Sequence, residues 1–98
     1  MKFEVYGKDG CAKCKSTKEK LTHLLDKAEV AETVDLDFYD MGTVEGLAEG
    51  AFNDVRDVPT VILRGDDGEA LARWEGMLPP SGEVQVFLGS PSARSAAG

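Results

Sequence analysis

The chain has 98 residues, of which 42% are hydrophobic, so we expect one domain with a modest core. Its 18 acidic and 11 basic residues give a net charge of -7, which argues against nucleic acid or an anionic membrane as the main partner. No apolar run reaches the ~18 residues of a membrane span, and the N-terminal residues lack a secretory signal. We therefore expect a cytoplasmic, reducing setting, where a close pair of cysteines is more often catalytic or metal-binding than a structural disulfide.

The first part of the chain predicts a strand, a helix and a second strand. Residues 2–7 form a short apolar run that is typical of a strand, and residues 8–10 form a loop. Apolar residues at helical spacing then predict a helix over about residues 12–29. Residues 34–39 alternate apolar and acidic side chains, which predicts an edge strand parallel to the first. The side chains expected to face the core from the helix are Leu21, Leu24, Leu25 and Ala28.

A second helix and a β-hairpin are predicted next. Thr43 can cap a short helix that runs to about residue 51. The side chains expected to face inward from it are Leu47 and Phe52. Residues 60–64 are strongly β-prone, and residues 70–74 return as the partner strand after a turn that contains Asp67-Gly68.

The last predicted helix covers about residues 81–88, and residues 90–98 have the composition of a disordered tail. The side chains expected to pack from this helix are Val84, Phe87 and Leu88. The complete order is β-α-β-α-β-β-α. It predicts an α/β fold for residues 1–89, with three layers around a four-stranded mixed sheet.

The two cysteines of the chain, Cys11 and Cys14, lie where the first strand turns into the first helix. Unpaired backbone N–H groups and the positive end of the helix dipole favour a negative charge there, such as a thiolate. Cys11 is the better nucleophile because it lies at the open end of the helix. Cys14 lies one turn further in and is the natural resolving thiol. The pair therefore indicates a dithiol redox site.

The reactivity of this site depends on how far the pKa of Cys11 is lowered. A helix dipole alone provides too little to lower a thiol pKa far. Backbone N–H groups at the sulfur and the nearby Lys8 and Lys13 have to supply the rest. The lysines that cluster around the pair, in an otherwise acidic chain, are Lys8, Lys13, Lys15, Lys18 and Lys20.

Two other interpretations of the pair remain open. Zinc needs four ligands, and beyond the cysteines the chain offers only His23, more than two helical turns from Cys14. We therefore expect no metal within one chain, although a metal or iron–sulfur site shared between two subunits stays possible. The other alternative is a binding module that uses a groove without turnover. Val58-Pro59 favours such a groove, because a proline there can form a cis bond and leaves the preceding backbone free for an extended partner.

These motifs resemble the thioredoxin superfamily, and within it the glutaredoxin-like branch. Residues 6–14 resemble the strand end, the lysine and the redox pair of that branch, and residues 14–21 are similar to the glutaredoxin-like electron donors of ribonucleotide reductase. Residues 58–61 resemble the cis-proline segment of the superfamily. Residues 73–77 resemble the Trp-x-Gly segment that follows the last strand in those donors.

The resemblance implies a thioredoxin-like sandwich that reduces protein disulfides as a thiol–disulfide oxidoreductase. It implies that Cys11 and Cys14 are catalytic. The residues that it implies as substrate contacts are Lys8, Lys13, Val58, Pro59 and Thr60. No cofactor needs to be bound, and a thioredoxin-reductase-type flavoenzyme or glutathione would return the electrons. We expect a monomer that binds neither nucleic acid nor membrane.

Overall fold

Four strands form one mixed sheet in the order β2-β1-β3-β4. The strands are β1 (Lys2–Gly7), β2 (Asp35–Asp40), β3 (Thr60–Arg64) and β4 (Ala70–Glu75). β1 runs parallel to β2 and antiparallel to β3, and β3 runs antiparallel to β4. This description comes from a computed structural model and covers residues 1–89, so the tail predicted at residues 90–98 lies outside it.

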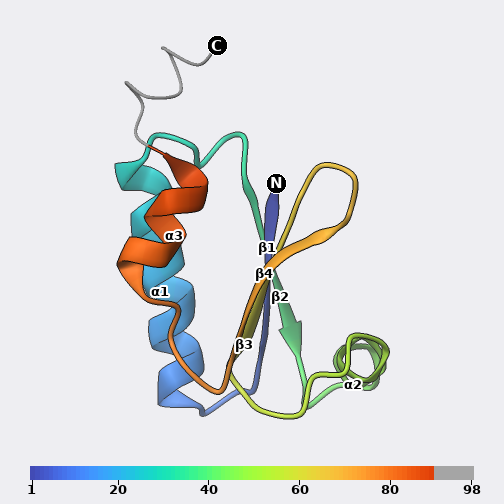
Figure 1. Cartoon of the computed structure of the whole chain (residues 1–98). Coiled ribbons are helices and arrows are strands. Elements are labelled where there is room, and N and C mark those ends of the chain that lie inside the picture. The colour runs from blue at the N-terminus through green and yellow to red at the C-terminus, as the bar shows by residue number, and fades with distance from the viewer. Residues whose placement is uncertain (90–98) are drawn as a thin grey trace.

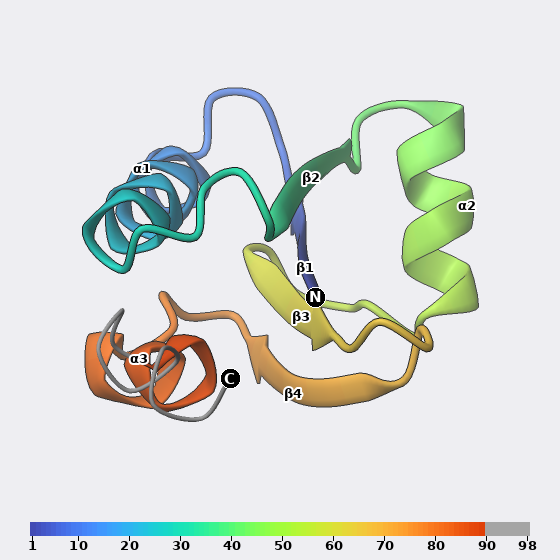
Figure 2. The same cartoon turned by 90° about the horizontal axis from the view of Figure 1, so that it is seen from above.

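Helices cover both faces of the sheet (Figure 1). α1 (Ala12–Lys27) and α3 (Ser81–Leu88) lie on one face and α2 (Val44–Phe52) lies on the other, as the view from above also shows (Figure 2). The predicted element order, the parallel pair, the hairpin and the three layers are confirmed. α1 ends two residues earlier than predicted, because Ala28 is its C-cap and Glu29 has a φ of 59°, outside the helical region.

The larger hydrophobic core lies between the sheet and the pair of helices α1 and α3. Its members are Phe3, Val5, Leu21, Leu24, Leu25, Ala28, Val30, Val34, Val61, Leu63, Trp74, Val84 and Leu88. The predicted core face of α1 is therefore confirmed. Of the predicted contacts from α3, Phe87 stays 38% exposed and packs edge-to-face on the buried Trp74, with ring centroids 6.4 Å apart. This core fixes the later part of α1 on the sheet through Leu21, Leu24 and Leu25.

α2 approaches the sheet through its glycines. Gly46 and Gly50, which lie four residues apart, are the buried residues of this helix, and a Cβ at Gly46 would collide with the carbonyl oxygen of Asp40. The prediction that Leu47 and Phe52 face inward is wrong, since they are 51% and 88% exposed. The glycines face the sheet, because only a residue without a Cβ lets α2 lie this close to the backbone of Asp40.

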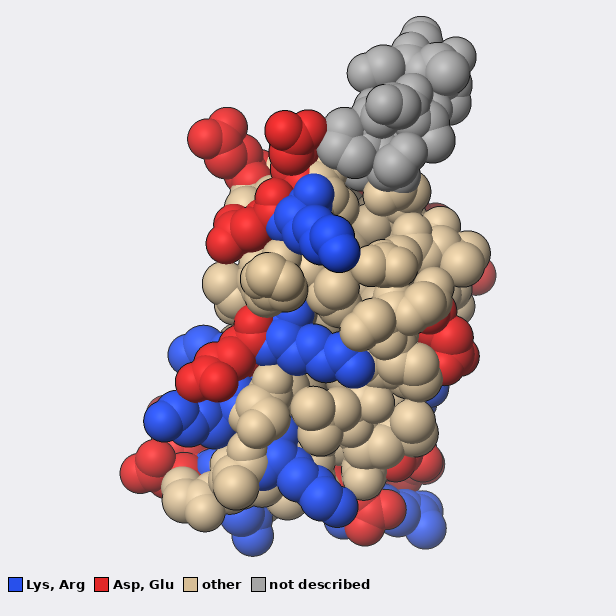
Figure 3. Space-filling model, turned by 90° about the vertical axis from the view of Figure 1, so that its left-hand side faces the viewer, with Lys and Arg blue, Asp and Glu red and all other residues tan. Residues whose placement is uncertain are grey.

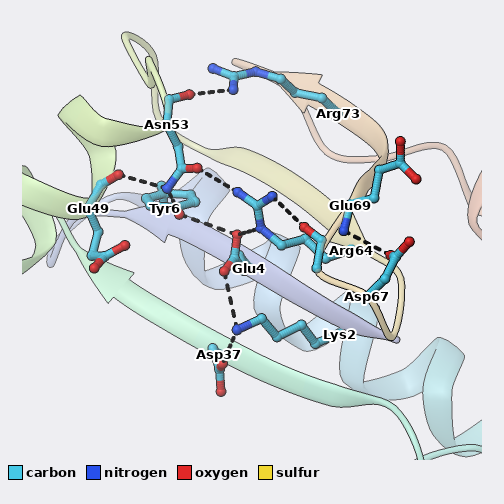
Figure 4. A network of polar contacts seen from close by, with 11 residues as sticks. Lys2, Glu4, Tyr6, Asp37, Glu49, Asn53, Arg64, Asp67, Glu69 and Arg73 are labelled. Atoms are coloured by element: carbon cyan, nitrogen blue, oxygen red, sulfur yellow. Dashed lines mark hydrogen bonds and ion pairs between the residues drawn. The ribbon is translucent and has the colours of Figure 1, made fainter.

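A polar network fills the space between the sheet and the end of α2 (Figure 4). The Arg64 guanidinium donates to the Glu4 carboxylate at 2.6 Å and to the side-chain carbonyl of Asn53 at 2.5 Å. Asn53 donates to the Tyr6 hydroxyl at 2.9 Å, and Arg73 donates to the backbone carbonyl of Asn53 at 2.5 Å. Glu4 is only 5% exposed, so its charge needs these partners. The network fixes the segment that leads from α2 into β3.

Replacing Gly46 by alanine should lower the free energy of unfolding by about 1–3 kcal/mol, because a backbone carbonyl has to move. The matched control is Gly82→Ala in α3, where a Cβ meets nothing within 4 Å. That change should raise the free energy of unfolding by about 0.5–1 kcal/mol through the helix preference of alanine. Urea unfolding measures both effects. Equal effects of the two substitutions would contradict the close approach of α2.

Candidate active site

α1 begins at Cys11, which is its N-cap residue. The Cys11 Sγ accepts a hydrogen bond from the backbone N–H of Cys14, with 3.2 Å between sulfur and nitrogen. Cys11 is partly exposed, and the first turn of α1 holds no acidic residue. The Cys11 sulfur is therefore the group that this helix end would stabilise as an anion.

Cys14 lies behind Cys11 and is only 1% exposed. It rests directly on the end of β1, because a Cβ at Gly7 would lie 2.9 Å from the Cys14 Sγ. Gly7 thus leaves the room that Cys14 fills, and a glycine at a strand end was the one feature of the sequence that pointed to this role. The predicted covered position of Cys14 is confirmed, and Cys11 is partly exposed and is the more accessible of the two. Both thiols are free.

The surroundings of the two sulfurs move their pKa values in opposite directions. The Cys14 thiol and the Cys14 backbone N–H both bond to the Cys11 sulfur and lower the pKa of Cys11, and the charge of Lys13 acts the same way. Burial first, and then the bond to Cys11, raise the pKa of Cys14. The expected help from Lys13 is borne out, whereas Lys8 is not among the main causes. The exposed sulfur therefore becomes a thiolate at a pH where the covered one is still a thiol.

A hollow of about 410 Å³ opens beside Cys11, and we call it the Cys11 hollow. Its walls come from the β1–α1 loop, the start of α1 and the end of β2. Besides the cysteines, its charged and aromatic lining residues are Lys8, Asp9, Lys15, Lys18, Phe38 and Asp40. A hollow of about 480 Å³ between α1 and α3 has Lys27 as its one titratable lining residue. The reactive groups therefore point to the Cys11 hollow as the candidate site.

Sequence reasoning did not connect Phe38 and Asp40 with the cysteines. They reach the Cys11 hollow because β2 pairs in parallel with β1, which places Asp40 beside Gly7. The predicted parallel βαβ unit could have indicated this, because two parallel strands end at the same edge of a sheet, so the last residues of β2 lie near the loop that follows β1. Lys8, a predicted substrate contact, also lines the hollow.

The segment Val58-Pro59-Thr60 lies at the same end of the sheet, because Thr60 pairs with Tyr6. The Val58–Pro59 bond is cis. The side chains of Pro59 and Thr60 are fully buried, and none of the three residues lines the Cys11 hollow. Val58 is partly exposed, and its backbone groups form no hydrogen bond within residues 1–89. Of this segment, Val58 is the residue with groups free for a partner.

His23 is exposed on α1, away from the cysteines. Within residues 1–89, no group of three or more His, Cys, Asp or Glu side chains is placed to hold a metal ion. Over the same residues, the helices are too short or too polar for any of them to span a bilayer.

The opposite pKa shifts can be tested with two single-cysteine variants. In Cys14→Ser, the Cys11 thiol should titrate below the value of an unperturbed thiol, about 8.5, because backbone N–H groups and Lys13 remain. In Cys11→Ser, the Cys14 thiol should titrate above it, because burial remains. The ultraviolet absorbance of the thiolate as a function of pH reports both values. Coinciding titration curves would refute the asymmetry of the pair.

No family model and no curated protein matches the sequence. Solved structures do match. Thioredoxin 1 of Thermosipho africanus TCF52B is 21% identical with a TM-score of 0.66, covering 99% of this chain and 97% of that one. A thioredoxin-fold protein of Helicobacter pylori is 17% identical with a TM-score of 0.69, covering 89% and 65%. A thioredoxin of Thermus thermophilus is 20% identical with a TM-score of 0.59, covering 98% and 72%. The chain therefore has the thioredoxin fold.

Proposed function

We propose that this protein is a dithiol–disulfide oxidoreductase that reduces disulfides of other proteins. The observation that supports this most is that the two cysteines differ in exposure and in the direction of their pKa shifts. Cys11 is partly exposed with a lowered pKa, and Cys14 is buried behind it with a raised pKa. Disulfide exchange needs an accessible thiolate to attack and a second thiol to resolve the mixed disulfide.

The reaction then proceeds in two exchanges. The Cys11 thiolate attacks one sulfur of the substrate disulfide, forms a mixed disulfide and releases the other substrate sulfur as a thiolate, which takes up a proton. Cys14 loses its proton and attacks the Cys11 sulfur, so that the second substrate sulfur leaves. The substrate gains two electrons and two protons, and the protein is left with a Cys11–Cys14 disulfide. Cys14 has to lose its proton for this second attack, and its burial, which raises its pKa, opposes that loss.

The substrate would lie along the end of the sheet that carries the cysteines. The free backbone groups of Val58 can pair with an extended segment of the partner protein. Pro59 and Thr60 are buried and would act by holding Val58 in place. Lys8 in the Cys11 hollow and the exposed Lys13 would contact the substrate from the other side of Cys11.

The oxidised pair must be reduced again by an electron donor. We propose a flavoenzyme of the thioredoxin-reductase type or glutathione, with the protein acting as a cytoplasmic, monomeric electron carrier without a bound cofactor. The resemblance of residues 14–21 to the glutaredoxin-like electron donors of ribonucleotide reductase supports this role.

Reduction of insulin disulfides in the presence of dithiothreitol tests the proposed activity. The wild-type protein should accelerate the precipitation of the insulin B chain, whereas Cys11→Ser should fall to the rate without protein, because the attacking sulfur is gone. The control is His23→Gln, an exposed position on the same helix, which should keep the full rate. Equal rates for wild type and Cys11→Ser would refute the proposal and favour a binding module.

A further inference from the structure

Positive charge is concentrated around the cysteines of an acidic chain. Residues 8–20 hold five lysines and two acidic residues, so the rest of the chain holds six basic and sixteen acidic residues. On the face that carries α1, Lys and Arg side chains gather mainly over the half that contains the start of this helix, with some acidic side chains between them (Figure 3). A partner that approaches Cys11 therefore meets a locally basic stretch of an otherwise acidic chain.

Among the residues that the structure describes, these lysines form no ion pair with a carboxylate. Within residues 1–89, the cationic groups that form ion pairs are the N-terminus, Lys2, Arg56, Arg64 and Arg73. None of the five lysines around the cysteines is among them, and four of these lysines are exposed. Their ammonium groups are available to carboxylates of a partner.

Three of the lysines share the Cys11 hollow with the nucleophile. Lys8, Lys15 and Lys18 line it together with Phe38, which is 39% exposed. The Lys18 Nζ lies 5.3 Å from the centre of this ring. Two carboxylates also line the hollow, and that of Asp40 accepts a hydrogen bond from a nearby backbone N–H at 2.8 Å. The lining of the hollow thus holds three ammonium groups and two carboxylates beside an apolar aromatic surface.

We propose that this arrangement selects polypeptide disulfides that carry acidic side chains close to the reactive cysteine. The inference rests on the proposed oxidoreductase function and names its substrate class. A carboxylate held by Lys15 or Lys18 would keep the neighbouring disulfide at Cys11, while an apolar side chain of the same peptide contacts Phe38. Exposed charge pairs are individually weak, so the selection should act mainly on the rate of productive encounter and should weaken with salt.

The test uses two synthetic peptides with the same disulfide, one with glutamates and one with lysines three residues from each cysteine. The rate at which each peptide oxidises the reduced protein is divided by its rate with dithiothreitol, which removes differences in intrinsic disulfide reactivity. At low salt, the acidic peptide should react about three- to tenfold faster than the basic one. At about 1 M salt, where the Debye length is about 3 Å, the ratio should approach one.

Variants assign the preference to the lysines. Lys15→Gln with Lys18→Gln should remove most of the preference, whereas Lys15→Arg with Lys18→Arg should keep it. Lys27→Glu, at the far end of α1, changes the net charge as much as the double glutamine variant and should also keep it. The ratio of the two peptide rates is compared within each variant, because any change in the reactivity of Cys11 cancels in it.

The outcomes separate the two proposals. Equal rates for the two peptides with wild type, or an unchanged preference in the double glutamine variant, would overturn the substrate preference and leave the oxidoreductase function standing. If neither peptide oxidises the reduced protein, both the oxidoreductase function and the substrate preference are refuted.

Discussion

The hydrogen bond from the Cys14 N–H to the Cys11 sulfur joins the fold of this protein to its chemistry. It exists because α1 begins at Cys11, and α1 begins there because β1 ends at Gly7 and a short loop turns the chain back over the sheet. The same turn packs the Cys14 side chain against Gly7, which has no Cβ to collide with it. One local arrangement thus favours the charged form of the first thiol and the neutral form of the second.

The two faces of the sheet contribute in different ways to the end that carries the cysteines. On the α1 side, apolar packing holds the later part of the helix, Cys14 packs on Gly7 near its start, and the lysines of the first turns stay at the surface. On the α2 side, the buried charge of Glu4 is matched by Arg64, which also holds Asn53 at the end of the helix. Asn53 starts the segment that leads to Val58, so this ionic network positions the backbone groups offered to a partner.

Patterns local in the sequence predicted the element order and the arrangement of the cysteines, because helix periodicity, strand alternation and a helix start act over a few residues. What they missed depends on contacts between distant residues. The outward position of Leu47 follows from the close approach of Gly46 to Asp40. The place of Phe38 in the Cys11 hollow follows from the register of β2 on β1. Sequence spacing alone fixes neither the approach nor the register.

The proposed chemistry requires that the substrate disulfide is attacked by the Cys11 sulfur and not by that of Cys14. The most direct measurement is the intact mass of each single-cysteine variant after reaction with a disulfide-containing protein, followed by peptide mapping. With Cys14→Ser, the mixed disulfide should accumulate on Cys11, because no second thiol is left to release the substrate. With Cys11→Ser, little adduct should form, because Cys14 is buried. An adduct that forms as fast on Cys14 as on Cys11 would contradict the account.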